Sequence, residues 1–247
     1  MKNKKYIGST VIIFGLILGI TLYGLGIRIG GKFIIGRLGT VSMIVPLSGI
    51  SVYIDQSRKV VTSKENELVT IKLSPGIHSV IVSGTGYLPW TKNIEMPSGG
   101  TKNISPIFVS QNSSGYIIGQ KDPEYWKIKN SITSDKLPSK SSPRVSKDGA
   151  VMVWVEGNSI MARSTNLGQA TNMIIQPEAT IRNVDFYKDR SDTIIFSMNS
   201  NVYAIEIDKK STQNFFPIYV GKSPSFVKVD ANSIYVLDEN FLMQVAI

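Results

Sequence analysis

Few side chains in this chain are of the types that perform chemistry, and their spacing indicates turns rather than catalysis. Asp148, Asp189 and Asp230 recur at intervals of 41 residues, each shortly before an apolar run. A calcium ion takes six to eight oxygen ligands. One carboxylate per turn is too few, so an Asx turn, in which the carboxylate accepts a local backbone N–H, is the better interpretation.

Nucleophilic and metal-dependent chemistry is poorly supported. The chain has no cysteine, and its one histidine is His78. Thiol nucleophiles, cysteine-based zinc sites and disulfides are excluded, and a Ser-His-Asp triad is disfavoured. The sequence contains neither a Gly-x-Ser-x-Gly elbow nor a phosphate-binding Gly-x-x-x-x-Gly-Lys loop. We therefore predict a protein that is not an enzyme and that uses no cofactor or metal, with His78 as a packing residue of a strand.

Four aromatic residues are candidates for contact with a glycan or a protein partner: Tyr87, Trp90, Tyr125 and Trp126. Trp and Tyr dominate interface energetics when they are exposed. The alternative is that they pack within the protein, with Tyr87 at a corner and Trp90 alternating into a core.

The net charge of +9 is concentrated at the amino-terminal end of the 247 residues. Residues 1–37 carry six basic side chains and no acidic one, whereas residues 111–247 carry fifteen basic and fourteen acidic side chains. A nucleic-acid-binding domain should carry its own basic face. The pattern favours anionic lipid headgroups instead.

Residues 6–27 are uncharged and rich in Ile, Leu, Gly and Val. About 20 such residues span a bilayer as a helix. A cleaved signal peptide is the alternative, but its apolar region is usually shorter and ends in an Ala-x-Ala-like site. We predict a transmembrane helix over 6–27 that contacts the bilayer, a cytoplasmic tail over 1–5, a juxtamembrane connector over 28–39 and an extracytoplasmic remainder.

Residues 40–110 read as short alternating strands separated by turn signals. Leu68–Leu73 alternates, meets Pro75-Gly76, and is followed by a second alternating run, Ile77–Val82. Strands at this spacing predict a small antiparallel β-sandwich.

This region resembles the PEGA family. The resemblance rests on Pro46-Leu47-Ser48-Gly49, on Val52-Tyr53-Ile54-Asp55, on Ile71-x-Leu73-x-Pro75-Gly76-x-His78-x-Val80 and on Gly86-Tyr87-x-Pro89-Trp90-x-Lys92. PEGA domains are β-sandwich modules of bacterial surface and envelope proteins, often beside one membrane helix. The name-giving Pro-Glu-Gly-Ala turn is replaced here by Pro46–Gly49, and Asp55-Gln56 stands where Asp-Gly is expected.

Residues 142–247 contain three similar segments, each with an Asp turn, a strand, an Asn turn and a second strand. A period of about 40 residues is that of β-propeller blades, and the pattern resembles WD-type and related bacterial propellers. Propellers have four to eight blades, so we expect an incomplete propeller-like domain of about three units. A different β-rich fold is the alternative, and residues 111–141 are expected to be a linker.

Together these features predict an all-β protein behind one membrane helix, at the bacterial cell envelope. We expect a binding or scaffolding protein that contacts cell-wall glycan or an envelope protein and no nucleic acid. The alternative is an oligomerising subunit of a surface assembly, such as a secretion or adhesion apparatus, which would self-associate through its β edges.

Overall fold

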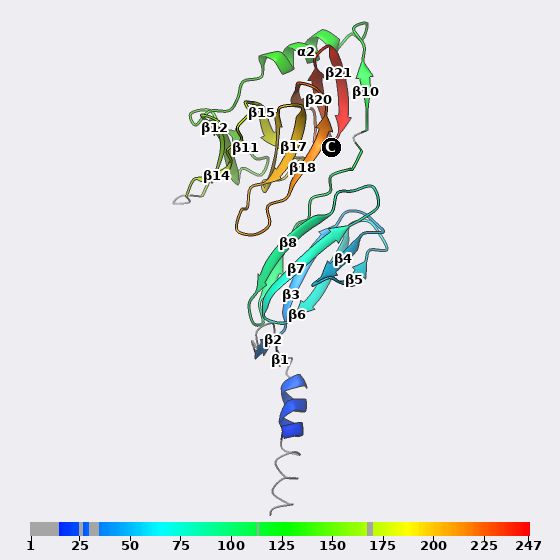
Figure 1. Ribbon diagram of the computed structural model, residues 1–247, viewed down its shortest axis with the longest axis vertical. Coiled ribbons are helices and arrows are strands. Elements are labelled where there is room, and N and C mark those ends of the chain that lie inside the picture. The colour runs from blue at the N-terminus through cyan, green and yellow to red at the C-terminus, as the bar shows by residue number, and fades with distance from the viewer. Residues whose placement is uncertain (1–14, 25–26, 30–34, 113, 167–169) are drawn as a thin grey trace, which may run out of the picture. The chain divides into compact units, whose positions relative to one another are not determined.

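The structure is a computed structural model that describes residues 15–24, 27–29, 35–112, 114–166 and 170–247. These residues are organised mainly as β-strands in several sheets (Figure 1), so the predicted all-β class is confirmed. The chain divides into two compact units. Unit 1 runs to Thr85 and includes Pro89–Ile107, and unit 2 comprises Gly86–Leu88 and Phe108–Ile247.

The amino-terminal segment is helical over 15–24 and is followed by an antiparallel pair, β1 (Ile27–Ile29) and β2 (Ile35–Arg37). In the part of the chain that the structure describes, no helix has the length and apolarity needed to cross a membrane. Residues 6–14 and 25–26 of the expected span lie outside the described residues. Ile27, expected as the last residue of the span, belongs to β1, because it pairs with Arg37.

Besides the β1–β2 pair, unit 1 contains two larger sheets. The first has the strand order β6-β3-β9, from β3 (Gly39–Val45), β6 (Glu67–Leu73) and β9 (Thr101–Asn103). The second has the order β5-β4-β7-β8, from β4 (Ser51–Ile54), β5 (Ser57–Val61), β7 (Gly76–Ser83) and β8 (Trp90–Met96).

Alternating side chains give each sheet of unit 1 a buried face. Val41, Met43 and Val45 of β3 are buried, as are Val80 and Val82 of β7. This period of two is the one that the sequence displayed. The expected region 40–110 and unit 1 do not coincide, because residues 86–88 within that region and 108–110 at its end belong to unit 2.

Two turns of unit 1 require left-handed backbone. Gly76, which opens β7, has a φ of 127°, a region that glycine alone enters readily. Asp55 and Gln56, between β4 and β5, have φ of 48° and 66°. Two successive residues with positive φ match the two-residue hairpin turns that suit the twist of paired strands.

Unit 2 contains three four-stranded antiparallel sheets. The first sheet consists of β11 (Arg144–Val145), β12 (Val151–Glu156), β13 (Ser159–Ser164) and β14 (Asn172–Ile175). The second sheet consists of β15 (Ile181–Phe186), β16 (Thr193–Met198), β17 (Asn201–Glu206) and β18 (Phe215–Val220). The third sheet consists of β19 (Pro224–Lys228), β20 (Ser233–Asp238), β21 (Phe241–Ala246) and β10 (Gly115–Ile118).

The three repeats read from the sequence correspond to these three sheets. Asp148, Asp189 and Asp230 lie in the turns that join the first and second strands of each sheet. Apolar clusters bury the first sheet against the second and the second against the third. Three sheets are fewer than the blades of a propeller, and the described residues show no closed ring of blades.

The segment 111–141 differs from the expected linker, because it supplies β10 and the helix α2 (Tyr125–Ser134). Its Ser, Lys and Pro content resembles that of a linker. However, Tyr125, Ile128 and Ile132 recur at helical spacing, and all three are buried. They cover Ile118 and Leu242 on the outer face of the third sheet, which fixes α2 to unit 2.

Candidate functional site

The four candidate contact residues differ in how far their side chains are exposed. Trp90 of β8 and Tyr125 of α2 are each only 2% exposed, so their side chains are occupied by packing. Tyr87 is half-buried in unit 2, with its ring edge-on to Phe108 at 6.1 Å between centroids. Trp126 is 58% exposed, and it is the candidate that remains available for contact.

Tyr125 and Trp126 differ in exposure because neighbouring residues of a helix such as α2 point about 100° apart. Tyr125 faces the third sheet with Ile128 and Ile132, whereas Trp126 faces solvent. The Tyr125 and Trp126 rings meet edge-on at 5.2 Å. The ammonium of Lys129 lies 5.4 Å from the centroid of Trp126 and 5.9 Å from that of Tyr125. A cation over an aromatic face at this range is attracted to it.

A row of polar aromatic side chains crosses the third sheet on the same face as α2. Tyr116 of β10 pairs with Gln244 of β21, which pairs with Tyr235 of β20. Tyr116 is 61% exposed, and its hydroxyl donates to Gln244 Oε1 at 2.5 Å. Gln244 Nε2 in turn donates to Ser233 Oγ at 3.3 Å. Burial and then the Glu124 carboxylate raise the pKa of Tyr235.

We call Tyr116, Trp126, Lys129, Tyr235 and Gln244 the aromatic surface. Trp126 and Lys129 lie on α2, whereas Tyr116, Tyr235 and Gln244 lie on the face of the third sheet against which α2 packs. The five residues offer exposed ring faces, an amide, phenol hydroxyls and an ammonium. Aromatic side chains of this kind present an apolar body with a polar tip. The arrangement can therefore bind a partner that offers both apolar and hydrogen-bonding groups.

A polar hollow of about 720 Å³ lies where the first strands of the three sheets end, lined by Lys147, Asp185, Asp189, Lys228, Val229, Asp230, Ala231 and Asn232. Asp189 Oδ2 accepts from Lys147 at 2.6 Å, and its Oδ1 lies 3.6 Å from the Lys228 ammonium. The hydrogen bond from Lys147 holds the pKa of Asp189 below its ordinary value, whereas burial raises that of Asp185. Asp189 thereby links all three sheets.

The other two recurrent aspartates form Asx turns, as predicted. Asp148 Oδ1 accepts from the backbone N–H of Ala150 at 3.0 Å, and Asp230 Oδ1 accepts from that of Asn232 at 2.7 Å. These hydrogen bonds occupy the carboxylates. Among the described residues, no three His, Asp or Glu side chains come together in a group that could hold a metal ion.

His78 joins three segments of unit 1. It is 8% exposed, with Nδ1 at 2.7 Å from Asp55 Oδ2 and Nε2 at 2.8 Å from the Ser74 carbonyl oxygen. Both ring nitrogens therefore lie within hydrogen-bond distance of an oxygen atom. Asp55 Oδ1 also accepts from the backbone N–H of Ser79. His78 is therefore a structural residue, as predicted for a histidine in a strand.

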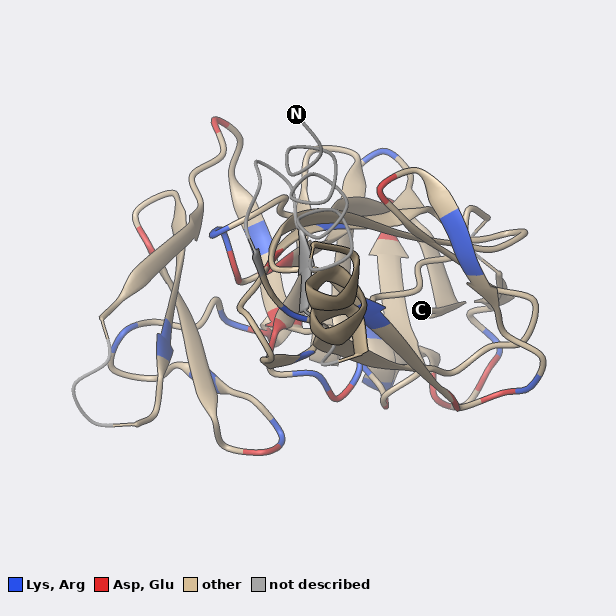
Figure 2. Ribbon diagram, turned by 90° about the horizontal axis from the view of Figure 1, so that it is seen from below, with Lys and Arg blue, Asp and Glu red and all other residues tan. Residues whose placement is uncertain are grey.

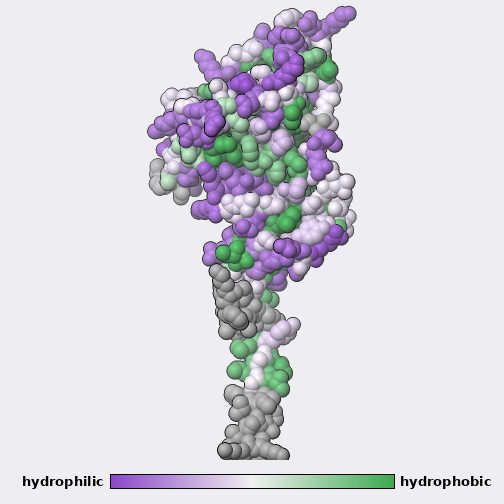
Figure 3. Space-filling view, viewed as in Figure 1, coloured by the Kyte–Doolittle hydropathy of each residue, from purple (hydrophilic) through white to green (hydrophobic). Residues whose placement is uncertain are grey.

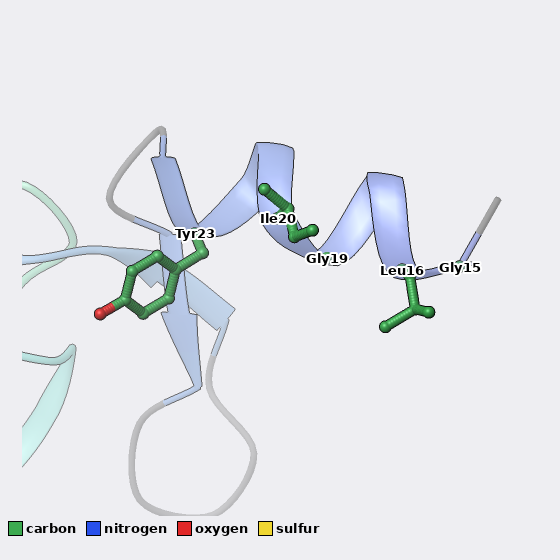
Figure 4. A pocket seen from close by; sticks show the side chains of 5 residues that line it. All are labelled: Gly15, Leu16, Gly19, Ile20 and Tyr23. Carbon is green, nitrogen blue, oxygen red and sulfur yellow. The ribbon is translucent and has the colours of Figure 1, made fainter. Parts of the chain in front are cut away.

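The helical segment over 15–24 presents an apolar recess of about 540 Å³, lined by Gly15, Leu16, Gly19, Ile20 and Tyr23 (Figure 4). Hydrophobic residues cover this segment in the space-filling view (Figure 3). In the two units, basic and acidic residues are interspersed along the strands and loops (Figure 2).

No known protein family matches the chain, and no curated protein matches it.

Sequence reasoning missed Tyr116, Lys129, Tyr235 and Gln244. Tyr116 lies in the segment interpreted as a linker, although Gly115–Ile118 has an apolar composition typical of a short strand. Its partner β21 lies more than a hundred residues later in the chain, and local patterns carry no signal for such a pairing. The helical spacing of Tyr125, Ile128 and Ile132 is the available signal for Lys129, because a residue four positions after Tyr125 lies beside it on a helix.

Proposed function

We propose that this chain is a non-enzymatic, membrane-anchored binding or scaffolding protein of the bacterial cell envelope. Its aromatic surface would contact cell-wall glycan or another envelope protein. The observation that carries the proposal is that Tyr116 and Trp126, both more than half exposed, are held on a packed sheet and helix beside Gln244 and Lys129. Rigid aromatic residues with polar neighbours suit the stacking of sugar rings and the anchoring of protein interfaces.

Attachment to the bilayer is supported by the amino-terminal sequence. Residues 6–27 carry no charge, and Lys2, Lys4 and Lys5 precede them. The side chains of Leu16, Ile20 and Tyr23 are exposed on the helical segment, where lipid would bury them. Lysines before an apolar helix favour a cytoplasmic amino terminus, and the two units would then lie outside the membrane.

At the level of domains, we propose that unit 1 is a PEGA-like spacer and that unit 2 is a reduced propeller of three blade-like sheets. The unit 1 proposal is supported by the two sheets and by the motif residues around His78. The unit 2 proposal is supported by the repeated four-stranded sheets, and by β10, which completes the last sheet from the other end of the domain.

Binding to cell-wall material tests the proposed contact. The full chain in detergent should sediment with purified peptidoglycan or other wall polymer. Replacing both Tyr116 and Trp126 by alanine should abolish this binding. Phe241→Ala is the matched control, because Phe241 is also 58% exposed but lies on the opposite face of the third sheet. Equal retention of both variants would exclude the aromatic surface as the contact.

Protease access in intact cells tests the proposed location. An added protease should degrade units 1 and 2 in cells whose inner membrane is intact, once the outer layers are permeable to the protease. Degradation that occurs only after lysis of the inner membrane would contradict the extracytoplasmic placement.

The second candidate function is that of an oligomerising subunit of a surface assembly, such as a secretion or adhesion apparatus. It is favoured by one observation, the apolar and unprotected edge of β10.

A further inference from the structure

Strand β10 is the outermost strand of the third sheet, and it is held closely against β21. The backbone N–H of Ala246 donates to the carbonyl oxygen of Ser114 at 2.8 Å. A Cβ on Gly115 would collide with the carbonyl oxygen of Gln244, so glycine permits this close approach. The side of β10 that faces β21 is therefore fully paired.

The other side of β10 presents backbone groups in a defined pattern. Residues of an antiparallel strand alternate in the direction of their N–H and C=O groups. Since Ser114 bonds toward β21, Tyr116 and Ile118 do so too. The N–H and C=O groups of Gly115 and Ile117 consequently point to the open edge, where they can pair with a further strand.

Most edge strands of the five larger sheets described here are protected against such pairing. Charged residues or proline blunt an edge, and they occur within β5, β6, β8, β9, β11, β15, β18 and β19. The two exceptions are β10 and β14. β14 pairs with β13 through a register shift, and Gln213 Nε2 donates to its Ile174 carbonyl oxygen at 3.5 Å. β10 pairs with β21 without a register shift, so it is the more regular of the two edges.

The side chains of β10 are also suited to an interface. Tyr116 is 61% exposed and Ile117 is 65% exposed, and they lie on opposite faces of the strand. No charged residue lies within β10. An apolar edge that carries neither charged residues nor proline can accept a further strand, and the four residues of β10 offer Gly115 and Ile117 for such pairing.

We propose that β10 is a self-association edge, on which a second copy of this chain pairs its own β10 in antiparallel orientation. The third sheet of one copy and the third sheet of the other then form one continuous sheet. A second copy brings the same unpaired groups and the same apolar side chains, so one two-fold contact covers both open edges and closes the assembly. With the two-fold axis at Ile117, this residue exchanges both of its backbone hydrogen bonds with its counterpart. The inference rests on the second candidate function, that of an oligomerising subunit, and is independent of what the aromatic surface binds.

Site-directed cross-linking tests this register in the full chain, which contains no native cysteine. Paired residues that exchange both hydrogen bonds have Cα atoms about 5.5 Å apart, within the range that a disulfide spans. Ile117→Cys in detergent should therefore give a disulfide-linked dimer on mild oxidation. Ile44→Cys is the control, because Ile44 is 63% exposed but lies on β3, the central strand of its sheet.

Sedimentation of uncross-linked protein provides the second measurement. The full chain should form a concentration-dependent dimer. Ile117→Lys should weaken this dimer by about tenfold or more, because it places like charges directly opposite on paired strands. Ile44→Lys should leave the dimer unchanged. Cross-linking of Ile117→Cys at the level of Ile44→Cys, or a dimer that survives Ile117→Lys, would overturn the proposal.

Discussion

His78 stabilises unit 1 through two hydrogen bonds from one small, buried ring. It joins Asp55 in the β4–β5 turn to Ser74 at the turn before β7. His78→Ala leaves these acceptors without their donor, which should lower the free energy of unfolding by about 1–3 kcal/mol. Urea denaturation followed by tryptophan fluorescence measures the loss. Ile77→Ala, at the exposed neighbouring position, should change it by less than about 0.5 kcal/mol.

The same contact gives unit 1 an acid-sensitive component of stability. Burial alone would raise the pKa of Asp55, but the hydrogen bonds from His78 and Ser79 outweigh it and hold this pKa below its ordinary value. Folding therefore favours the ionised carboxyl. Its contribution is complete above the ordinary aspartate pKa of about 3.9 and is lost as the pH falls through the lower folded value. Denaturation curves recorded from about pH 6 to pH 2 should show a smaller acid loss in His78→Ala than in the unmodified chain. Parallel losses in the two proteins would contradict this role of Asp55.

At the scale of elements, α2 depends on its apolar stripe, since its N-cap residue, Glu124, makes no side-chain capping hydrogen bond. Ile132 is 3% exposed against the third sheet. Ile132→Ala should therefore lower the free energy of unfolding of unit 2 by about 2–5 kcal/mol. Lys127→Ala, whose side chain is 82% exposed, should change it by less than about 0.5 kcal/mol. Comparable losses in the two variants would show that α2 is not held by this stripe.

A buried polar side chain, Asn183, also stabilises β15, the first strand of the second sheet. Asn183 Oδ1 accepts from the backbone N–H of Phe226 at 3.0 Å and from Ser197 Oγ at 3.2 Å, in a buried setting. It thus connects β15 to β19 of the third sheet. Asn183→Ala leaves a buried backbone donor unpaired and should cost about 1–3 kcal/mol. The exposed Asn172→Ala serves as the control in thermal denaturation.

Sequence patterns predict the elements of this protein better than its long-range pairings. The alternation of Leu68–Leu73 and the recurrence of Asp148, Asp189 and Asp230 locate strands and turns correctly, because burial on one face and local turn chemistry act over a few residues. The position of β10 depends on a partner strand at the far end of the chain. Tyr125 and Trp126 differ in exposure only because α2 forms and docks.

At the scale of the whole molecule, each unit has its own buried residues. Those of unit 1 include Val41, Val80 and Trp90, and those of unit 2 form clusters between its sheets and beneath α2. Units with separate cores can unfold separately. The tryptophans are distributed so that this can be measured, because Trp90 lies in unit 1, whereas Trp126 and Trp154 lie in unit 2.

We therefore expect two unfolding transitions in urea. A chain with Trp126→Phe and Trp154→Phe reports on unit 1, and a chain with Trp90→Phe reports on unit 2. Adding His78→Ala should move only the unit 1 transition to lower urea, and adding Ile132→Ala should move only that of unit 2, because distant sites with no shared partners contribute independently. A shift of both signals by either substitution would mean that the two units unfold as one cooperative body.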